Sequence, residues 1–95
     1  MPRPRPLRTF VERDGIIFVF THDPDDPSLL HIFARHLTTI DDALRVWFDQ
    51  AAEDVWNDRY SRWESSGPTH VLYWTWLIPE QRVLIITCFT KDNPA

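Results

Sequence analysis

Two basic side chains in the last third of the sequence have the chemistry needed to handle a phosphate group or a proton. His70 and Arg82 belong to the stretches HVLYWTWLI and RVLIITCFT, which are joined by the short link PEQ. Arginine donates paired hydrogen bonds to phosphate oxygens, and histidine exchanges protons near neutral pH. Beside each other across a hairpin, these side chains would form a phosphate clamp and an acid–base group. The alternative is that Arg82 is a solvated residue at a strand end.

A second group combines aromatic and basic residues between positions 56 and 63. Trp56, Tyr60 and Trp63 are spaced for one face of a helix, and Arg59 and Arg62 lie between them. Such a pattern can stack the bases of single-stranded RNA while the cations contact phosphates. The same spacing also packs a helix onto a sheet, which is the commoner use of aromatic residues in small domains.

Histidine and aspartate residues cluster near the first third of the chain without the spacing of a metal site. His31 and His36 are five residues apart, whereas two helical histidines that bind one ion are usually four apart. Loops rich in aspartate are commonly solvated turns. We therefore expect no metal ion and no other cofactor. The full cluster consists of His22, Asp23, Asp25, Asp26, His31 and His36.

The elements that must position these residues begin and end with β-hairpins. Asp14-Gly15 separates two runs rich in apolar residues, which predicts that residues 8–12 and 15–21 pair as strands. Residues 69–78 and 82–90 form the second predicted hairpin, joined by a tight turn.

Two helices are predicted between the hairpins. Asp26 followed by Pro27 favours a helix over residues 27–37. Thr39 and Asp42 resemble a capping box at the start of a second helix over residues 40–56, whose apolar residues recur at helical spacing.

Asn57-Asp58 interrupts this second helix and is expected to start a short third one that ends near residue 65. The sequence therefore predicts an α+β fold, in which an antiparallel sheet packs against two or three helices in the order hairpin, helix, helix, hairpin. Residues 8–91 would form a single domain, after a flexible Pro/Arg-rich arm at 1–7 and before a tail at 92–95.

Composition restricts the class of protein. The chain has 95 residues and a net charge of −4, so its body is acidic and disfavours non-specific binding to nucleic acid. The single cysteine, Cys88, lies in an apolar run and cannot form an internal disulfide. The sequence contains no apolar stretch long enough to cross a bilayer. We expect a soluble cytoplasmic protein.

Three stretches resemble the RelE/ParE-like toxins of bacterial toxin–antitoxin systems. ALRVWF, with Trp56 nine residues after Trp47, is similar to the HigB-type pattern of an Ala-Leu-x-x-Trp-aromatic helix and a later tryptophan. HVLYWTW and RVLIITCF resemble the paired strands that follow it there. The positions similar to the BrnT branch are the Asp-Pro dipeptide before the helices, Arg35-His36, Thr39, Ala43, Asp58, Ser61 and Glu64.

The resemblance implies an endoribonuclease that cleaves mRNA on the ribosome and is neutralised by a cognate antitoxin protein. Arg82 is then the phosphate clamp, His70 the proton donor or acceptor, Arg62 a second clamp and Tyr60 a stacking platform, with Trp56, Trp63 and Arg59 as further binding residues. The 2′-hydroxyl of RNA would supply the nucleophile, so the protein would only position the RNA and move protons.

A different class of function also fits the acidic composition. A non-catalytic module, either an inhibitor or immunity-type protein or a relative of the toxins that has lost activity, would cover the basic surface of another protein by charge complementarity.

Overall fold

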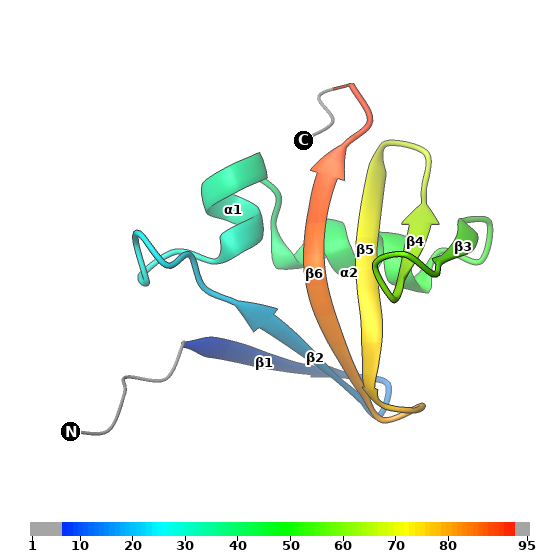
Figure 1. The fold of residues 1–95 in the computed structure, drawn as a ribbon, viewed down its shortest axis with the longest axis horizontal. Helices are drawn as coiled ribbons and strands as arrows, with labels where there is room; N and C mark the ends of the chain where they lie inside the picture. The colour runs from blue at the N-terminus through cyan, green and yellow to red at the C-terminus, as the bar shows by residue number, and fades with distance from the viewer. Residues whose placement is uncertain (1–6, 93–95) are drawn as a thin grey trace.

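Six strands form one mixed sheet in the computed structural model, which describes residues 7–92. The order across the sheet is β1-β2-β6-β5-β4-β3, so β1 and β3 are its two edges (Figure 1). The strands are β1 (Arg8–Arg13), β2 (Ile16–Thr21), β3 (Glu53–Asn57), β4 (Arg62–Ser66), β5 (His70–Ile78) and β6 (Arg82–Thr90).

Local turn chemistry explains the two terminal hairpins. Asp14 and Gly15 both have positive φ, at 53° and 81°, as a two-residue hairpin turn between β1 and β2 requires. β5 and β6 pair antiparallel with His70 opposite Thr90 and Ile78 opposite Arg82. β2 and β6 pair in parallel, which joins the two hairpins into one sheet. Both predicted hairpins are confirmed.

Two short helices connect β2 to β3. They are α1 (His31–His36) and α2 (Ile40–Phe48). Thr39 caps α2, since its hydroxyl accepts a hydrogen bond from the Asp42 backbone N–H while the Asp42 carboxylate accepts one from the Thr39 N–H, which confirms the predicted capping box. α2 crosses behind β6, β5 and β4 in Figure 1.

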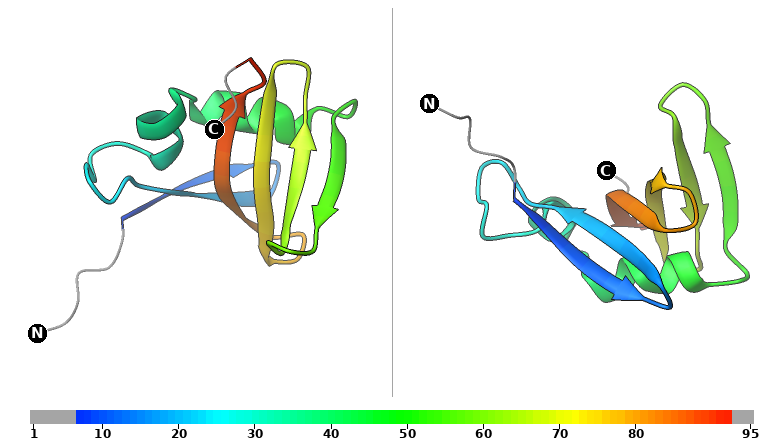
Figure 2. Two further views of the ribbon diagram at one scale, coloured as in Figure 1. Left: turned by 45° about the horizontal axis from the view of Figure 1, so that its top comes forward. Right: turned by 90° about the horizontal axis from the view of Figure 1, so that it is seen from below.

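The sheet therefore has two different faces. We call the face against α2 the helix face, and the face toward the viewer of Figure 1 the open face, because within residues 7–92 no helix crosses it. Directly paired residues share a face and faces alternate along each strand. Figure 2 shows the strong twist that turns β1 and β2 away from the strands at the other edge.

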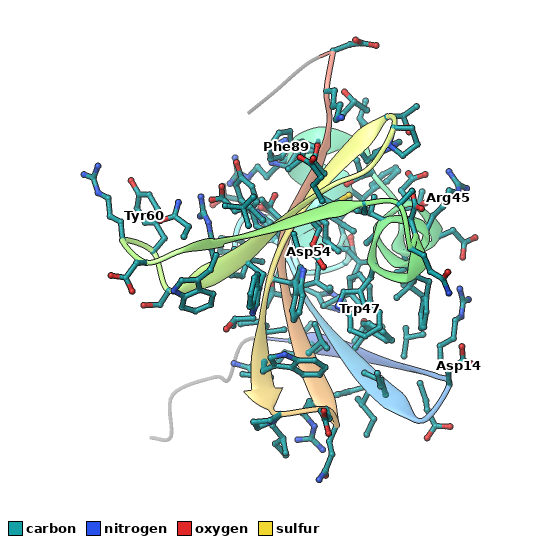
Figure 3. The ribbon with its side chains drawn as sticks, turned by 90° about the vertical axis from the view of Figure 1, so that its right-hand side faces the viewer. Asp14, Arg45, Trp47, Asp54, Tyr60 and Phe89 are labelled. Atoms are coloured by element: carbon teal, nitrogen blue, oxygen red, sulfur yellow. The ribbon has the colours of Figure 1, made fainter. Side chains whose placement is uncertain are left out.

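The helix face carries the apolar core and all five tryptophans. Trp47 of α2 packs edge-on against Trp74 and Trp76 of β5, with ring centroids 5.8 and 6.0 Å apart. Trp63 stacks on Trp74 and in turn contacts Trp56 at the sheet edge. Trp47 lies between helix and sheet in Figure 3, and this line of rings ends at Trp56, whose side chain remains 43% exposed.

The predicted fold class is wrong. Residues 7–92 form mainly a six-stranded mixed sheet with two short helices, not an antiparallel sheet packed on two or three helices. α1 is shorter than the predicted 27–37, because the Asp26 side chain accepts hydrogen bonds from the Ser28 N–H and hydroxyl and so holds a turn instead of capping a helix.

The largest error concerns residues 49–65. α2 ends at Phe48, and β3 and β4 form a hairpin where a helix extension and a third helix were predicted. Asn57 accepts a hydrogen bond from the Tyr60 N–H, so the polar side chain expected to start a helix instead stabilises the β3–β4 turn. Val55 and Trp56 also have high strand propensity. Within residues 7–92, neither helix has the length and apolarity needed to span a bilayer.

Candidate nucleic-acid interface

A stack of arginine and tyrosine side chains lies over the open face next to the β3–β4 turn. The Arg62 guanidinium carbon is 3.9 Å from the centre of the Tyr73 ring and 4.6 Å from the centre of the Tyr60 ring. The Arg59 guanidinium lies on the same Tyr60 ring at 5.3 Å. We call these four residues the Arg–Tyr stack. Figure 3 shows Tyr60 on the opposite side of the sheet from Trp47.

Strand alternation brings these residues together. Glu64 is directly opposite Tyr73, so Arg62, two residues before Glu64 on β4, shares the open face with both. The β3–β4 turn carries Arg59 and Tyr60 over the same face. Tyr60 remains 56% exposed, which leaves aromatic surface available for another flat group.

Hydrogen bonds fix the orientation of Arg62. Its Nε donates to Glu64 Oε2 over 3.0 Å, and the Asn57 side-chain amide donates to the same oxygen over 3.0 Å. Arg62 is therefore neutralised by Glu64 and serves as the rigid centre of the stack. The cation that remains beside Tyr60 is Arg59, which has no carboxylate of residues 7–92 within 4.0 Å.

Arg82 lies on the open face at the start of β6, near the lower end of the sheet in Figure 1. It is opposite Ile17 of β2 and adjacent to Val83, which points to the core. Arg82 makes no ion pair within residues 7–92, and its Nε is buried without a hydrogen-bond partner there. The hydroxyl of Thr87, farther along β6, is also buried without a hydrogen-bond partner among residues 7–92. The Arg82 guanidinium thus forms no ion pair with a carboxylate of residues 7–92.

His70 is separated from the other predicted catalytic residues. It pairs with Thr90 at one end of the β5–β6 hairpin, whereas Arg82 lies at the other end. The His70 side chain also lies on the helix face. Its Nε2 is 3.9 Å from a carboxylate oxygen of Asp42, and its Nδ1 is 2.8 Å from the Thr69 hydroxyl. Because the sheet lies between them, His70 cannot exchange a proton with a group held by Arg62 or Tyr60.

The predicted binding residues also divide between the two faces. Arg59 belongs to the Arg–Tyr stack, whereas Trp56 and Trp63 extend the tryptophan line of the helix face. Sequence reasoning missed Tyr73 as a member of the stack and Glu64 as the partner that orients Arg62. The signal for Tyr73 was the alternation along the strand, which puts its side chain on the other face of the sheet from Leu72 and Trp74.

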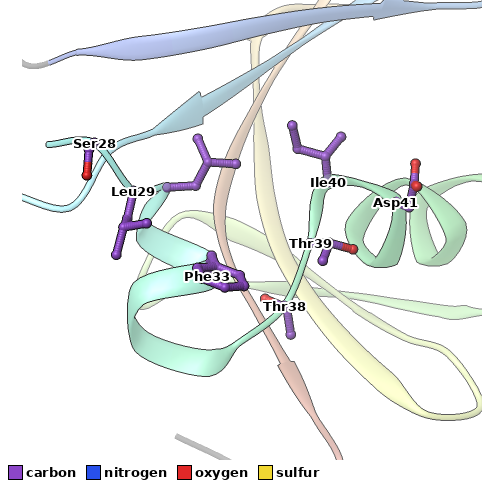
Figure 4. Close-up of a pocket in the computed structure, with 8 residues that line it drawn as sticks. Ser28, Leu29, Phe33, Thr38, Thr39, Ile40 and Asp41 are labelled. Atoms are coloured by element: carbon purple, nitrogen blue, oxygen red, sulfur yellow. The ribbon is translucent and has the colours of Figure 1, made fainter. Parts of the chain in front are cut away.

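No other described feature has the character of an active site. A groove of about 570 Å³ lies between α1 and the start of α2 (Figure 4). Its wall is mostly apolar and shares no residue with the predicted site; the lining residues are Ser28, Leu29, Leu30, Phe33, Thr38, Thr39, Ile40 and Asp41.

Two groups that often take part in catalysis have shifted pKa values. Burial, with a smaller effect of Asp42, raises the pKa of the Cys88 thiol to about 12, so Cys88 is not a nucleophile at neutral pH. Burial, followed by the nearby charges of His31 and Arg35, lowers the pKa of His36. Among residues 7–92, no three His, Cys, Asp or Glu side chains are grouped closely enough to hold a metal ion.

Comparison of the chain with protein-family models, with curated proteins and with solved structures finds no match. The function must therefore be argued from the site. An exposed aromatic ring supported by stacked guanidinium groups, with a second uncommitted arginine on the same face, is suited to binding flat rings joined by anionic links.

Proposed function

We propose that the open face of the sheet binds single-stranded RNA and that the protein is a RelE/ParE-like toxin component, as the resemblance in sequence implies. The observation that supports this best is the Arg–Tyr stack with its exposed Tyr60 ring. A base would stack on Tyr60 while Arg59 contacts the adjoining phosphate, and Arg82 would contact a phosphate farther along the strand. The proposal includes a cytoplasmic location and a cognate antitoxin that covers this face.

If the protein cleaves RNA, the proton-transfer groups must come from the open face. Glu64 and the phenol groups of Tyr60 and Tyr73 are the candidates there, since His70 lies on the other side of the sheet. Arg62 would orient Glu64 through its hydrogen bond. The 2′-hydroxyl of the RNA would attack the adjoining phosphorus, and the bond from that phosphorus to the 5′-oxygen of the next nucleotide would break as this oxygen takes up a proton. Expression of the protein in bacteria should then slow growth and fragment mRNA, and His70→Ala should leave both effects intact.

RNA binding tests the proposal directly. A fluorescently labelled oligouridine is titrated with the protein, and its anisotropy gives the affinity. Loss of one stacking platform costs about 1–3 kcal/mol, so Tyr60→Ala should weaken binding by roughly 5- to 150-fold. The matched control is Arg45→Ala, which removes an exposed cation from α2 on the helix side and should leave affinity unchanged. Equal affinity of Tyr60→Ala and the unmodified protein would contradict the proposal.

One observation favours the alternative of an acidic protein-binding module. Exposed carboxylates gather along the edge strand and the turn that follows it, at Glu53, Asp54 and Asp58, without a cation of residues 7–92 within 4.0 Å. If the protein neither binds oligouridine nor slows growth, a salt-sensitive complex with a basic protein is the expected activity.

A further inference from the structure

The two edges of the sheet are open to pairing with another strand. β1 and β3 have similar lengths, and among residues 7–92 each pairs with a single neighbouring strand in an uninterrupted register. Neither contains proline, lysine or a bulge, and the other charged side chains that protect an edge strand differ in sign between the two edges. Each also exposes an apolar side chain on the open face: Phe10 of β1 is 58% exposed and Val55 of β3 is 59% exposed.

The charges of these edges are opposite. β1 carries Arg8 and Arg13 against Glu12 alone. At the other edge, residues 53–61 carry three carboxylates against Arg59. Pairing β3 with β3 of a second copy would bring six carboxylates together, whereas pairing β3 with β1 of a second copy brings each acidic segment to a basic one.

The strand directions also allow β3 of one copy to pair with β1 of another. Between β1 and β3 the sheet contains four antiparallel pairs and one parallel pair, so the two edge strands run in the same direction. When copies repeat head to tail with their open faces on the same side, β3 of one copy meets β1 of the next in parallel.

One parallel register gives favourable side-chain pairs on both faces of the joined sheet. Phe10 opposite Val55 places the two exposed apolar groups together on the open face. The same register puts Arg8 opposite Glu53 and Arg13 opposite Asp58, and it puts Val11 opposite Trp56 on the helix face. Arg13 is 4.0 Å from Asp41 in the single chain, at the limit of an ion pair, so this cation can turn toward another carboxylate.

We infer that the chain associates with itself head to tail, through parallel pairing of β3 of one copy with β1 of the next. The contact is heterologous, so each copy keeps one free edge and the assembly grows into a chain or closes into a ring. This inference does not depend on RNA binding.

Two variants block one edge each. Phe10→Glu adds a negative charge to β1 and should repel the acidic β3, and Val55→Glu removes the apolar partner that Phe10 requires. Both positions are exposed, so far-UV circular dichroism should show that both variants fold. Leu77→Glu is the matched control, because Leu77 is an exposed leucine on the central strand β5.

Sedimentation velocity over a range of protein concentrations gives a decisive result. The unmodified protein and Leu77→Glu should form larger species as concentration rises, and less so when salt is raised from about 0.1 M to about 1 M. Phe10→Glu and Val55→Glu should each remain monomeric. An equimolar mixture of the two should form a dimer and nothing larger, because one intact β1 and one intact β3 remain.

Three results would overturn the inference. The first is an unmodified protein that stays monomeric at every concentration, and the second is a mixture of the two variants that stays monomeric. The third is self-association by Phe10→Glu alone or by Val55→Glu alone, since that would require two copies to join through identical edges.

Discussion

Leu37 is placed unfavourably by both its backbone and its side chain. It ends α1 with φ at 55° and ψ at 26°, in the left-handed region where glycine or asparagine is usual. Its N–H donates to the Phe33 carbonyl and the next N–H, of Thr38, donates to Ile32, so the conformation is required to close the helix. The side chain is 76% exposed and recovers little by burial. Leucine at this position is thus not explained by the stability of the single chain.

Leu37→Gly should therefore stabilise the fold. The left-handed conformation costs a leucine about 1–2 kcal/mol, and the greater freedom of glycine in the unfolded chain offsets part of this gain. Chemical denaturation should show the free energy of unfolding rising by about 0.5–1 kcal/mol. Leu77→Gly is the control, because glycine in a strand should lower that free energy. A loss of stability in Leu37→Gly would mean that the exposed leucine makes contacts that matter for folding.

At the scale of elements, the sequence predicted what is decided locally. The Asp14-Gly15 turn and the Thr39–Asp42 capping box both act within four residues, and both are present as predicted. The structure of residues 49–65 could not be predicted from such local signals. An Asn57 side chain can satisfy the first N–H groups of a helix or those of a hairpin turn, and the choice depends on pairing of β4 with β5.

The same reasoning explains the candidate site. Arg59, Tyr60 and Arg62 were predicted to act together, and a turn holds them close. Tyr73 joins them only through long-range strand pairing, and the distance between His70 and Arg82 follows from the register of β5 and β6. The parallel pairing of β2 with β6 has no local signal, because its strands are separated by both helices and three other strands.

The capping box of α2 should depend on pH. Burial raises the pKa of Asp42, but hydrogen bonds from Thr39 and the nearby His70 and Arg45 lower it more, so the net pKa lies below its ordinary value of 3.8. Ionised Asp42 therefore stabilises the fold at neutral pH, and this stabilisation is lost as pH falls through the lowered pKa.

Asp42→Ala should cost about 1 kcal/mol of unfolding free energy at pH 7, which is the usual value of a lost cap. The difference from the unmodified protein should shrink as the pH falls below 3.8. Asp41→Ala is the control: Asp41 is in the same first turn but is exposed and accepts no capping hydrogen bond, so a smaller loss is expected. Denaturation across this pH range distinguishes the two, and an equal, pH-independent loss would exclude the capping explanation.

At the scale of the whole molecule, an acidic protein is proposed to bind an anionic polymer, which requires that its charges be separated in space. Carboxylates line α2 and the β3 edge, whereas Arg59 and Arg82 lie on the open face without a carboxylate of residues 7–92 within 4.0 Å. Arg62 lies on the same face but is neutralised by Glu64. RNA should therefore neutralise these two cations and leave the acidic surface in solvent.

The salt dependence of RNA affinity tests this separation of charge. Each phosphate contact to a single strand contributes about −0.7 to the slope of log K against log salt concentration, so contacts from Arg59 and Arg82 predict a slope of about −1.4. Arg59→Ala and Arg82→Ala should each make the slope shallower by about 0.7, because each removes one phosphate contact. Tyr60→Ala should lower the affinity at every salt concentration without changing the slope, since stacking releases no counterions. Oligouridine anisotropy titrations at several salt concentrations measure all four slopes. A slope near zero, or an unchanged slope in both arginine variants, would show that the open face does not contact the phosphates.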